Sequence, residues 1–425
     1  MSGFIRFDDS FLRAVRDAVD LPALIGRDID LRPAGSSGFK ACCPFHGENT
    51  PSFFVKHTGF YRCFGCSKTG DAIEWLRERH GMSFQEAAIH LAHAQGITLP
   101  PSPDLPEEAR KQFQHHARLR HVLEEAGRIY QRGLDRSPAA RHYLAAEREI
   151  DADSVAKFEL GVVASGVTRL LSRHPRQRLL DAGLAFARDA GEFGDRFTHR
   201  IMFPIRNQQG SLVSFAGRLY LPNDRREAKY LNGPETAIFR KSDELFGMHL
   251  AHRAIRISRV AVLVEGYFDV VSLHSIGECR AVAPMGTAIT PGQIERALQV
   301  ADQLYFAYDA DAAGTRAATA AARLFLEHMR DGQSAHFVNL PAGQDPDTFA
   351  RTEGASGWQQ ALDNAKPLSE LAVQHVLDGL DLQVVEMRVA AAQRARDLLQ
   401  RVGKASMYRH SLRLALEAVV GIPLE

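Results

Sequence analysis

The sequence predicts a multidomain protein in which α+β and α/β parts follow one another along 425 residues. Three observations support this class. Most of the cysteines fall before residue 70, among short alternating runs typical of a small β sheet. Short apolar runs after residue 259 alternate with helical stretches, as in a parallel α/β sheet. After Trp358 the periodicity is helical to the end, which predicts a C-terminal helical bundle.

The bulk composition is that of an ordinary globular protein, because 45% hydrophobic and 24% charged residues allow several cores with a solvated surface. No apolar run is long enough to span a bilayer, so no membrane partner is expected. The N-terminal MSGFIRFDDSFLRAV has early acids and no apolar segment, unlike a signal peptide. We therefore expect a cytoplasmic protein, whose clustered cysteines favour metal binding over disulfides.

Changes in pattern divide the chain into five expected segments. The run LPPSPDLPEE contains four prolines and predicts a semi-rigid, extended spacer between domains. A basic stretch with a hairpin-like pair of runs, RIMFPIRNQQGSLVSFAGRLY, follows it. The expected segments are a small metal-binding β domain at 1–98, the Pro-rich linker at 99–108, a mixed α+β basic subdomain at 109–257, a parallel α/β domain at 258–350 and a helical subdomain at 351–425.

The first segment should consist of a small sheet flanked by helices. FLRAVRDAVDLPALIG has helical apolar spacing, and residues 31–64 are rich in glycine, aromatic and turn residues. DAIEWLRERHG and SFQEAAIHLAHAQG predict two amphipathic helices, each ended by glycine. Ser83 followed by Glu86 fits a capping box at the start of the second.

Cys43-x2-His46 and Cys63-x2-Cys66 form two pairs with the spacing of metal ligands. A two-residue gap lets both side chains of a pair converge on one ion, and three thiolates with one imidazole make the closed tetrahedral set of a structural zinc site. Cys42 is one residue out of phase, so in an extended chain it points to the opposite face, and we expect it to be a small buried residue. The alternative, that all four ligand candidates are merely buried side chains, is disfavoured by the spacing.

Aromatic residues around these ligands are interleaved with cations. Rings stack on bases and cations contact phosphates, so the combination is typical of a platform for single-stranded nucleic acid. Most of the phenylalanines can equally form the core of a small zinc domain. The side chains expected to make contact are Lys56, Tyr61, Arg62 and Lys68.

CPFHGENTPSF followed by FYRCFGCSKTGDAIEWL resembles the zinc-binding domain of bacterial DNA primases of the DnaG type. The similarity covers the ligands, the TPSF turn and the helix after the second pair. It implies a zinc-ribbon-like domain with one structural Zn²⁺.

Carboxylates occur where two neighbouring strands should end. Glu265 closes VAVLVE, and Asp309 and Asp311 close QLYFAYDAD. The carboxyl ends of adjacent parallel strands converge on one crevice, so we expect these side chains to lie together, and GQDPDTF adds Asp345 and Asp347. Such a set repels itself unless divalent cations neutralise it, and Mg²⁺ prefers a few carboxylates plus water and substrate phosphate. The alternative is a set of acids that cap helices or turns without metal.

A glutamate on one strand and Asp-x-Asp on another, with GTAIT between them, is similar to the Toprim domain. Bacterial primases, type IA and II topoisomerases and certain nucleases share that fold. The resemblance implies that Glu265, Asp309 and Asp311 are catalytic and hold Mg²⁺ or Mn²⁺. It also implies that Asp345 and Asp347 hold another metal ion or the triphosphate.

The basic segment resembles the motifs that precede the Toprim part in the same primases, through RIMFPI, FAGRLY and KYLNGPETAIFRK. YLAAEREI resembles a further motif that usually ends in arginine-glycine, whereas here Arg148 is followed by Glu149. The resemblance implies that the matching positions contact the template backbone or the incoming triphosphate. They are Arg148, Arg200, Arg218, Lys229, Asn232 and Lys241.

The resemblance covers nearly the whole chain and implies a DNA primase, a nucleotidyltransferase that makes short RNA primers from rNTPs on single-stranded DNA. Its product would be an RNA–DNA hybrid, and its place the replication fork in the nucleoid. Family members usually carry a further helical domain that docks on the replicative helicase. We expect that partner only if such a domain exists beyond Glu425.

Two rival classes stay open. A Toprim nuclease or topoisomerase would break strands, but the zinc domain and the basic motifs argue against it. A non-catalytic single-stranded DNA-binding module would need only the zinc and the basic surface, and the complete set Glu265, Asp309 and Asp311 argues against that. A fused helicase is not expected, because no G-x4-G-K-[ST] loop is present.

Overall fold

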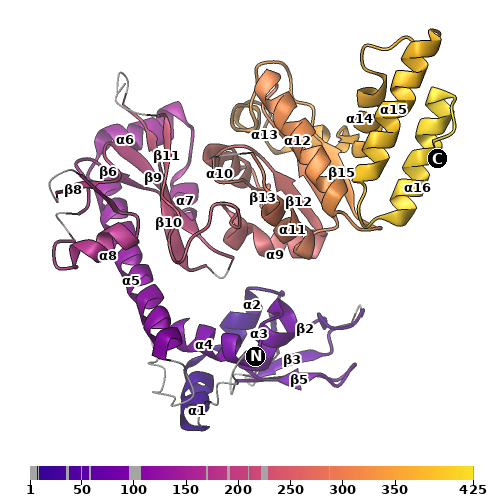
Figure 1. The fold of residues 1–425 in the computed structure, drawn as a ribbon. Coiled ribbons are helices and arrows are strands. Elements are labelled where there is room, and N and C mark those ends of the chain that lie inside the picture. The colour runs from indigo at the N-terminus through magenta and orange to yellow at the C-terminus, as the bar shows by residue number, and fades with distance from the viewer. Residues whose placement is uncertain are drawn as a thin grey trace. The chain divides into compact units, whose positions relative to one another are not determined.

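The chain forms two compact units, Met1–His115 and His116–Glu425, whose boundary falls inside helix α5 (Glu107–Asp135) (Figure 1). The expected Pro-rich linker lies outside the described residues except for its last two positions, which begin α5. The computed structural model describes residues 7, 9–34, 38–48, 50–56, 59–94, 107–168, 171–188, 192–208, 210–221, 228–286 and 288–424.

The N-terminal unit is built on an antiparallel sheet whose strands lie in chain order. The strands are β1 (Arg32–Pro33), β2 (Gly38–Ala41), β3 (Phe53–Lys56), β4 (Phe60–Cys63) and β5 (Thr69–Gly70). The helices are α1 (Asp9–Ala18), α2 (Leu21–Gly26), α3 (Ala72–His80) and α4 (Phe84–Ala94). The predicted capping box forms, since the Ser83 N–H donates to the Glu86 carboxylate over 2.8 Å and the Glu86 N–H donates to the Ser83 hydroxyl over 3.2 Å.

One face of this sheet forms the core of the unit. Alternation along β3 and β4 buries Phe53 and Val55 on one strand and Tyr61 and Cys63 on the other, around the buried ring of Trp75. The opposite face is exposed. The alternation along β3 and β4 therefore makes one face of the sheet buried and the other exposed.

The C-terminal unit begins with a second antiparallel sheet, in the order β11-β10-β9-β6. The predicted hairpin is confirmed, because β9 (Arg200–Arg206) pairs antiparallel with β10 (Leu212–Leu219). The remaining elements of this part are α6 (Pro138–His142), the π-helical turn η2 (Tyr143–Glu147), α7 (Ala152–Lys157), β6 (Gly161–Val163), α8 (Arg176–Asp181), β7 (Ala185–Ala187), β8 (Phe193–Asp195) and β11 (Tyr230–Asn232).

A third sheet, in the order β13-β12-β14-β15-β16, confirms the predicted parallel α/β alternation, and only β16 (Lys366–Pro367) runs antiparallel. Its parallel strands are β12 (Val260–Leu263), β13 (Ala281–Val282), β14 (Gln303–Phe306) and β15 (Ser334–Phe337). The helices around it are α9 (Met248–Ser258), α10 (Tyr267–Ser275), α11 (Pro291–Val300), α12 (Ala312–His328) and α13 (Pro346–Asp363). Helix α13 crosses the expected boundary at residue 350 and is interrupted at Gly354, whose φ of 63° and ψ of −164° are not helical.

Three helices complete the chain, α14 (Leu368–Leu377), α15 (Val385–Arg401) and α16 (Ser406–Val420) (Figure 1). They share one apolar core with the parallel sheet, in which Phe306 of β14 and Phe325 of α12 belong to the same cluster as Leu412 of α16. A second core joins Phe203 of β9 to Phe268 of α10. Across the part of the chain that the structure describes, no helix has the length and apolarity needed to cross a membrane.

Candidate functional site

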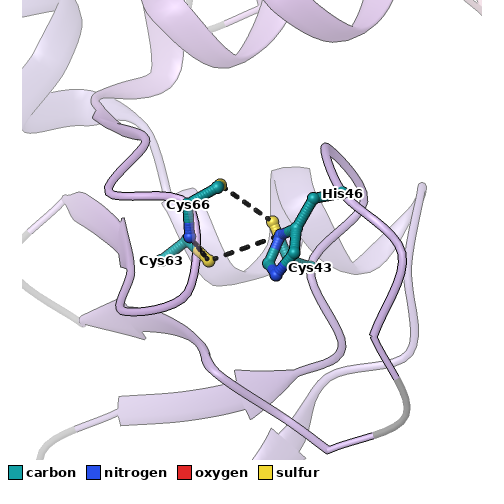
Figure 2. Close-up of side chains that lie close together, drawn as sticks. All are labelled: Cys43, His46, Cys63 and Cys66. Carbon is teal, nitrogen blue, oxygen red and sulfur yellow. Dashed lines mark hydrogen bonds between the residues drawn. The ribbon is translucent and has the colours of Figure 1, made fainter.

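Two loops of the N-terminal unit bring Cys43, His46, Cys63 and Cys66 together, with the side chains facing one another (Figure 2). All four ligand atoms lie within 4.8 Å of one another, which no other group of Cys, His, Asp or Glu among the described residues achieves. Cys43 Sγ is 3.7 Å from Cys66 Sγ, and His46 Nδ1 is 3.8 Å from Cys63 Sγ. The geometry is that of a site able to enclose one ion.

The thiols at this site cannot all ionise by themselves. Burial, reinforced by the neighbouring thiols, raises the pKa of Cys43 to about 12. At Cys63 burial is outweighed by hydrogen bonds from the Ser52 hydroxyl and from backbone N–H groups, which lower the pKa to about 6. A divalent cation would stabilise every thiolate at once, and three sulfurs with one imidazole nitrogen suit zinc. The donor set fits that metal, and the chain has a zinc-binding site.

Local backbone geometry shapes the two ligand pairs. The N–H groups of Gly65 and Cys66 both donate to Cys63 Sγ, over 3.3 Å each. A Cβ at Gly65 would lie 2.6 Å from His46 Nε2, so any larger residue there would displace the His46 ring. Cys42 is not part of the ligand group, and the expectation that it is buried is wrong, because it is exposed.

The exposed face of β2–β4 presents cations beside aromatic rings. Lys40, Phe54 and Arg62 are successive cross-strand neighbours, and Lys56 lies opposite Phe60. The Arg62 guanidinium lies 5.2 Å from the centre of the Phe64 ring, which is 65% exposed. The exposed rings are therefore phenylalanines that sequence reasoning assigned mainly to the core, and strand alternation was the available signal.

One of the expected contacts in this region needs revision. Tyr61 is 1% exposed and packs against Phe53 and Trp75, so it cannot present its ring to a base. Lys68 remains a candidate for contact, since its side chain is 41% exposed in a surface ion pair with Glu78, 4.7 Å from the centre of the Phe45 ring. Lys56 and Arg62 are exposed, so they remain available for contact.

In the C-terminal unit, Glu265 follows β12 and Asp309 follows the adjacent parallel strand β14. The Asp309 N–H donates to Glu265 Oε1 over 3.2 Å. Asp311 caps α12 by accepting from the Gly314 N–H over 2.7 Å, and Asp345 caps α13 in the same way. The structure thus brings Glu265 and Asp309 into direct contact and places the other two at the start of neighbouring helices.

The electrostatics show that these carboxylates influence one another. Burial, then repulsion by Glu265, Asp345 and Asp311, raises the pKa of Asp309 to about 6, and the cation of Lys229 opposes that shift. Burial and Asp311 likewise raise the pKa of Glu265. Partly buried carboxylates that repel one another fit a divalent cation, and Glu265, Asp309, Asp311 and Asp345 are the residues that could hold it.

Sequence reasoning missed Asp269, which belongs to the same electrostatic cluster. It lies on the first turn of α10, where it accepts from the Gly266 N–H over 2.7 Å. Burial, then repulsion by Asp345 and Asp309, raises its pKa to about 8. The signal was its position four residues after Glu265, on the helix that this glutamate introduces.

Gly314 was also missed. A Cβ at this position would lie 2.0 Å from the carbonyl oxygen of Asp309. Helix α12 therefore packs directly on the Asp309 backbone, and the DADAAG run needs a residue without a side chain at its end.

Asp347, which was expected to hold a metal ion or the triphosphate, is bonded by protein groups instead. It is 2% exposed, and Ser272 Oγ and Arg351 Nε bond to its Oδ1 over 2.6 and 3.3 Å. Arg148 Nη1 donates to its Oδ2 over 2.7 Å. Both oxygens are engaged by protein groups, so Asp347 joins three segments of the chain.

Two of the basic residues are likewise buried, so the expectation that they contact template or triphosphate does not hold. Arg200 is fully buried, and its guanidinium donates to the backbone carbonyls of Gly217, Ala228 and Lys229. Arg218 is 7% exposed and donates to the Tyr230 hydroxyl over 2.6 Å. These arginines support the basic subdomain from inside.

The other basic-segment residues differ in their surroundings. Asn232 Nδ2 donates to the Met285 carbonyl over 2.9 Å, and its Oδ1 accepts from the Tyr267 hydroxyl over 2.6 Å. Asn232 thereby ties β11 to the start of α10, next to Glu265. Lys229 is exposed and Lys241 half-buried, so both retain surface for an anionic ligand.

Arg148 is held in place from several sides. Besides its bond to Asp347, its Nε donates to the Tyr143 hydroxyl over 3.1 Å. Its guanidinium also lies 4.8 Å from the centre of the Phe268 ring. The structure therefore shows Arg148 as a contact between η2 and α13, with 18% of its side chain exposed.

Three family models match successive parts of the chain. They are described as CHC2 zinc finger over residues 7–105, DNA primase catalytic core, N-terminal domain, over residues 129–252, and Toprim-like over residues 262–350.

Comparisons with single proteins agree with these matches. The DNA primase of Neisseria meningitidis serogroup A is 35% identical over 420 residues, which cover 97% of this chain and 70% of that protein. The crystal structure of the zinc-binding and RNA polymerase domains of the Aquifex aeolicus primase matches with a TM-score of 0.66 at 28% identity, and the match covers 98% of each chain. A DnaG primase catalytic domain bound to single-stranded DNA matches with a TM-score of 0.66 at 32% identity, and the match covers 72% of this chain and 99% of that one.

Proposed function

The chain belongs to the DNA primase family and is an enzyme that makes RNA primers, and we propose that it does so by metal-assisted nucleotidyl transfer from rNTPs on single-stranded DNA. The observation that carries this proposal is the contact between Glu265 and Asp309 at the ends of adjacent parallel strands, with a raised pKa on each. Such a pair is suited to bind a divalent cation, and the triphosphate of an rNTP would supply further oxygen ligands to that cation.

In the proposed reaction, the 3′-hydroxyl oxygen of one ribonucleotide forms a bond to the α-phosphorus of the next. The bond from that phosphorus to the β-phosphate bridging oxygen breaks, and pyrophosphate leaves. Bound Mg²⁺ or Mn²⁺ would lower the pKa of the attacking hydroxyl and neutralise charge on the triphosphate. The carboxylates of Glu265, Asp309 and Asp311 would hold that cation, and Asp345 would extend the set.

The remaining residues bind and position the substrates. Lys229 is close enough to Asp309 to lower its pKa and is exposed, so it can contact a phosphate beside the carboxylates. Lys241 has similar access to an anion. Buried Arg200 and Arg218 stabilise β9–β11 without touching substrate. The product of the reaction is an RNA strand paired with the DNA template.

We assign template contact to the exposed face of β2–β4, which the structural Zn²⁺ would stabilise. Its cations Lys56 and Arg62 suit phosphates, while Phe54, Phe60 and Phe64 offer rings for unstacked bases. A related catalytic domain has been solved bound to single-stranded DNA, which supports the same template for this chain.

The test is a primer-synthesis assay with labelled rNTPs on single-stranded DNA with Mg²⁺. Asp309→Ala should lower the rate at least about a thousandfold, since it removes a ligand of the reacting metal. Asp302→Ala is the matched control, because Asp302 lies at the opposite end of β14 in an exposed pair with Arg259. Full activity of Asp309→Ala would refute the site, and nicking of supercoiled DNA without primer synthesis would favour a Toprim nuclease.

A further inference from the structure

Both carboxylate oxygens of Glu48 contact groups beside the zinc site. Its Oε1 accepts from the backbone N–H groups of Cys43 over 2.6 Å and Ser52 over 3.1 Å. Its Oε2 accepts from the Ser52 hydroxyl over 2.5 Å and lies 3.3 Å from His46 Nε2. The side chain is 13% exposed, so it is held within the loop and is not a free surface acid.

These contacts reach three of the four ligands. Glu48 touches Cys43 through its backbone and His46 through its ring. It reaches Cys63 indirectly, since the Ser52 hydroxyl lies 3.2 Å from Cys63 Sγ. One side chain therefore joins the first ligand pair to the second.

The His46 ring is fixed in a definite orientation. Its Nδ1 faces the thiols, 3.8 Å from Cys63 Sγ (Figure 2). Its Nε2 lies 3.3 Å from the Glu48 carboxylate. The ring also passes close over Gly65, where a Cβ would lie 2.6 Å from Nε2 and 2.8 Å from Cε1. A carboxylate beside Nε2 keeps the proton on that nitrogen and leaves the Nδ1 lone pair for a metal ion.

We propose that Glu48 is a positioning residue of the zinc site, which selects the metal-binding tautomer of His46 and holds the backbone of Cys43 and Ser52 in place for ligand binding. This role requires both the charge and the reach of the side chain. Glutamine keeps the length but loses one acceptor and the charge, while aspartate keeps the charge but cannot span from the backbone N–H groups to the ring. Both substitutions should therefore weaken zinc binding.

The test uses the full chain stripped of metal, with zinc affinity measured by competition against a chromophoric chelator at neutral pH. Glu48→Gln and Glu48→Asp should each bind zinc about 10- to 100-fold more weakly than the wild type. Glu74→Gln is the matched control, because Glu74 lies in the same unit but pairs with Arg77 at the surface. It should bind zinc like the wild type.

Cobalt substitution gives a second readout that a general loss of stability would not produce. With saturating Co²⁺, Glu48→Gln should keep the sulfur-to-cobalt charge-transfer bands but shift the d–d bands, because the three thiolates stay bound at saturation while the imidazole changes its orientation. Circular dichroism shows whether the loaded variant is folded, and if Glu48→Gln is not, Glu48→Asp decides by the same measurements.

A zinc affinity of the folded variant within about threefold of the wild type overturns the proposal, as does equal weakening in Glu74→Gln. The inference rests on the zinc site described above, and the two fail differently. A wild-type chain that binds no zinc overturns the site itself, whereas equal binding by wild type and variant overturns only the role of Glu48.

Discussion

Replacing Gly314 with alanine should slow primer synthesis about a hundredfold while leaving the protein folded. Gly314 lies in the first turn of α12, and a Cβ there would be 2.0 Å from the Asp309 carbonyl oxygen. Cβ contacts in proteins essentially never fall below 3.0 Å, so helix and loop must separate by at least 3.0 − 2.0 = 1.0 Å. The contacted atoms are backbone, which cannot rotate away as a side chain could.

The size of the effect follows from that displacement. Asp309 and Asp311 would move relative to Glu265, and a misplacement of about 1 Å costs roughly a hundredfold in rate, or about 2.7 kcal/mol of transition-state stabilisation. Alanine is the better helix former by about 0.5–1 kcal/mol, which offsets part of the strain in the folded state. The melting temperature should therefore fall by no more than a few degrees.

The assay is single-turnover primer extension at saturating rNTPs, paired with thermal unfolding. Gly127→Ala is the matched control, because a Cβ on that residue of α5 would meet its nearest atom at an ordinary 3.5 Å. It should keep full activity. A Gly314→Ala enzyme with a rate within about threefold of the wild type would show that the close approach to Asp309 does not set the geometry of the carboxylates.

Three further changes should have distinct effects. Cys43→Ser should release zinc from the chain and Cys42→Ser should not, as measured by metal content after gel filtration. Asp347→Asn should lower the free energy of unfolding by about 3 kcal/mol without changing the Mg²⁺ concentration needed for half-maximal activity, because it removes one partner of a buried ion pair. The raised pKa values of Asp309, to about 6, and Asp269, to about 8, mean that the folded chain binds more protons than the unfolded chain from about pH 4 to 8. Metal-free stability should then fall as pH rises, and Mg²⁺ should raise the melting temperature more at pH 8 than at pH 6.

Each of these expectations can fail in a specific way. Equal zinc loss from both cysteine variants would mean that Cys42 shares the site. An altered Mg²⁺ requirement of Asp347→Asn at unchanged stability would return Asp347 to the metal site. A Mg²⁺ effect independent of pH would show that the cation does not compete with protons on Asp309 and Asp269.

The sequence predicted the elements whose signals are local. The strands before Glu265 and Asp309 are continuous apolar runs, and parallel strands bring their carboxyl ends together whatever lies elsewhere in the chain. The two-residue gaps in Cys43-x2-His46 and Cys63-x2-Cys66 are likewise local signals, because each gap lets the two side chains of a pair converge on one ion. Both sets lie where the patterns indicated.

Long-range burial could not be predicted. Arg200 lies on β9, which is covered on both faces, so strand alternation gave no sign that its charge is internal. Asp347 follows Asp345 at the spacing of a second metal ligand. Its partner Arg148 is 199 residues away in the sequence, so no local pattern could predict their contact. The Asp269 cluster was missed because a helix-capping acid has the same sequence signature with or without neighbouring charges.

Glu149 stands where the related primase motif usually has glycine, and its backbone conformation is unusual for a residue with a side chain. Its φ of 53° is left-handed, a conformation that glycine adopts freely and that costs other residues about 1–2 kcal/mol. The Glu149 carboxylate lies 3.5 Å from Arg351 Nη1, in an exposed pair that offsets only a fraction of that cost. The resemblance showed the position to be unusual, and the backbone angle gives the reason.

Residues 252 and 262 mark the end of one family match and the start of the next. Two contacts join residues on opposite sides of this interval: the ion pair of Arg148 with Asp347 and the hydrogen bond of Asn232 with Tyr267. The apolar core around Phe203 and Phe268 crosses it too. A fragment cut at that interval would remove Arg148 from Asp347, which would keep Arg351 as a partner, and would expose aromatic rings to water. The two family matches therefore do not delimit separate structural units within His116–Glu425, and a fragment cut between them should be less stable than the whole unit.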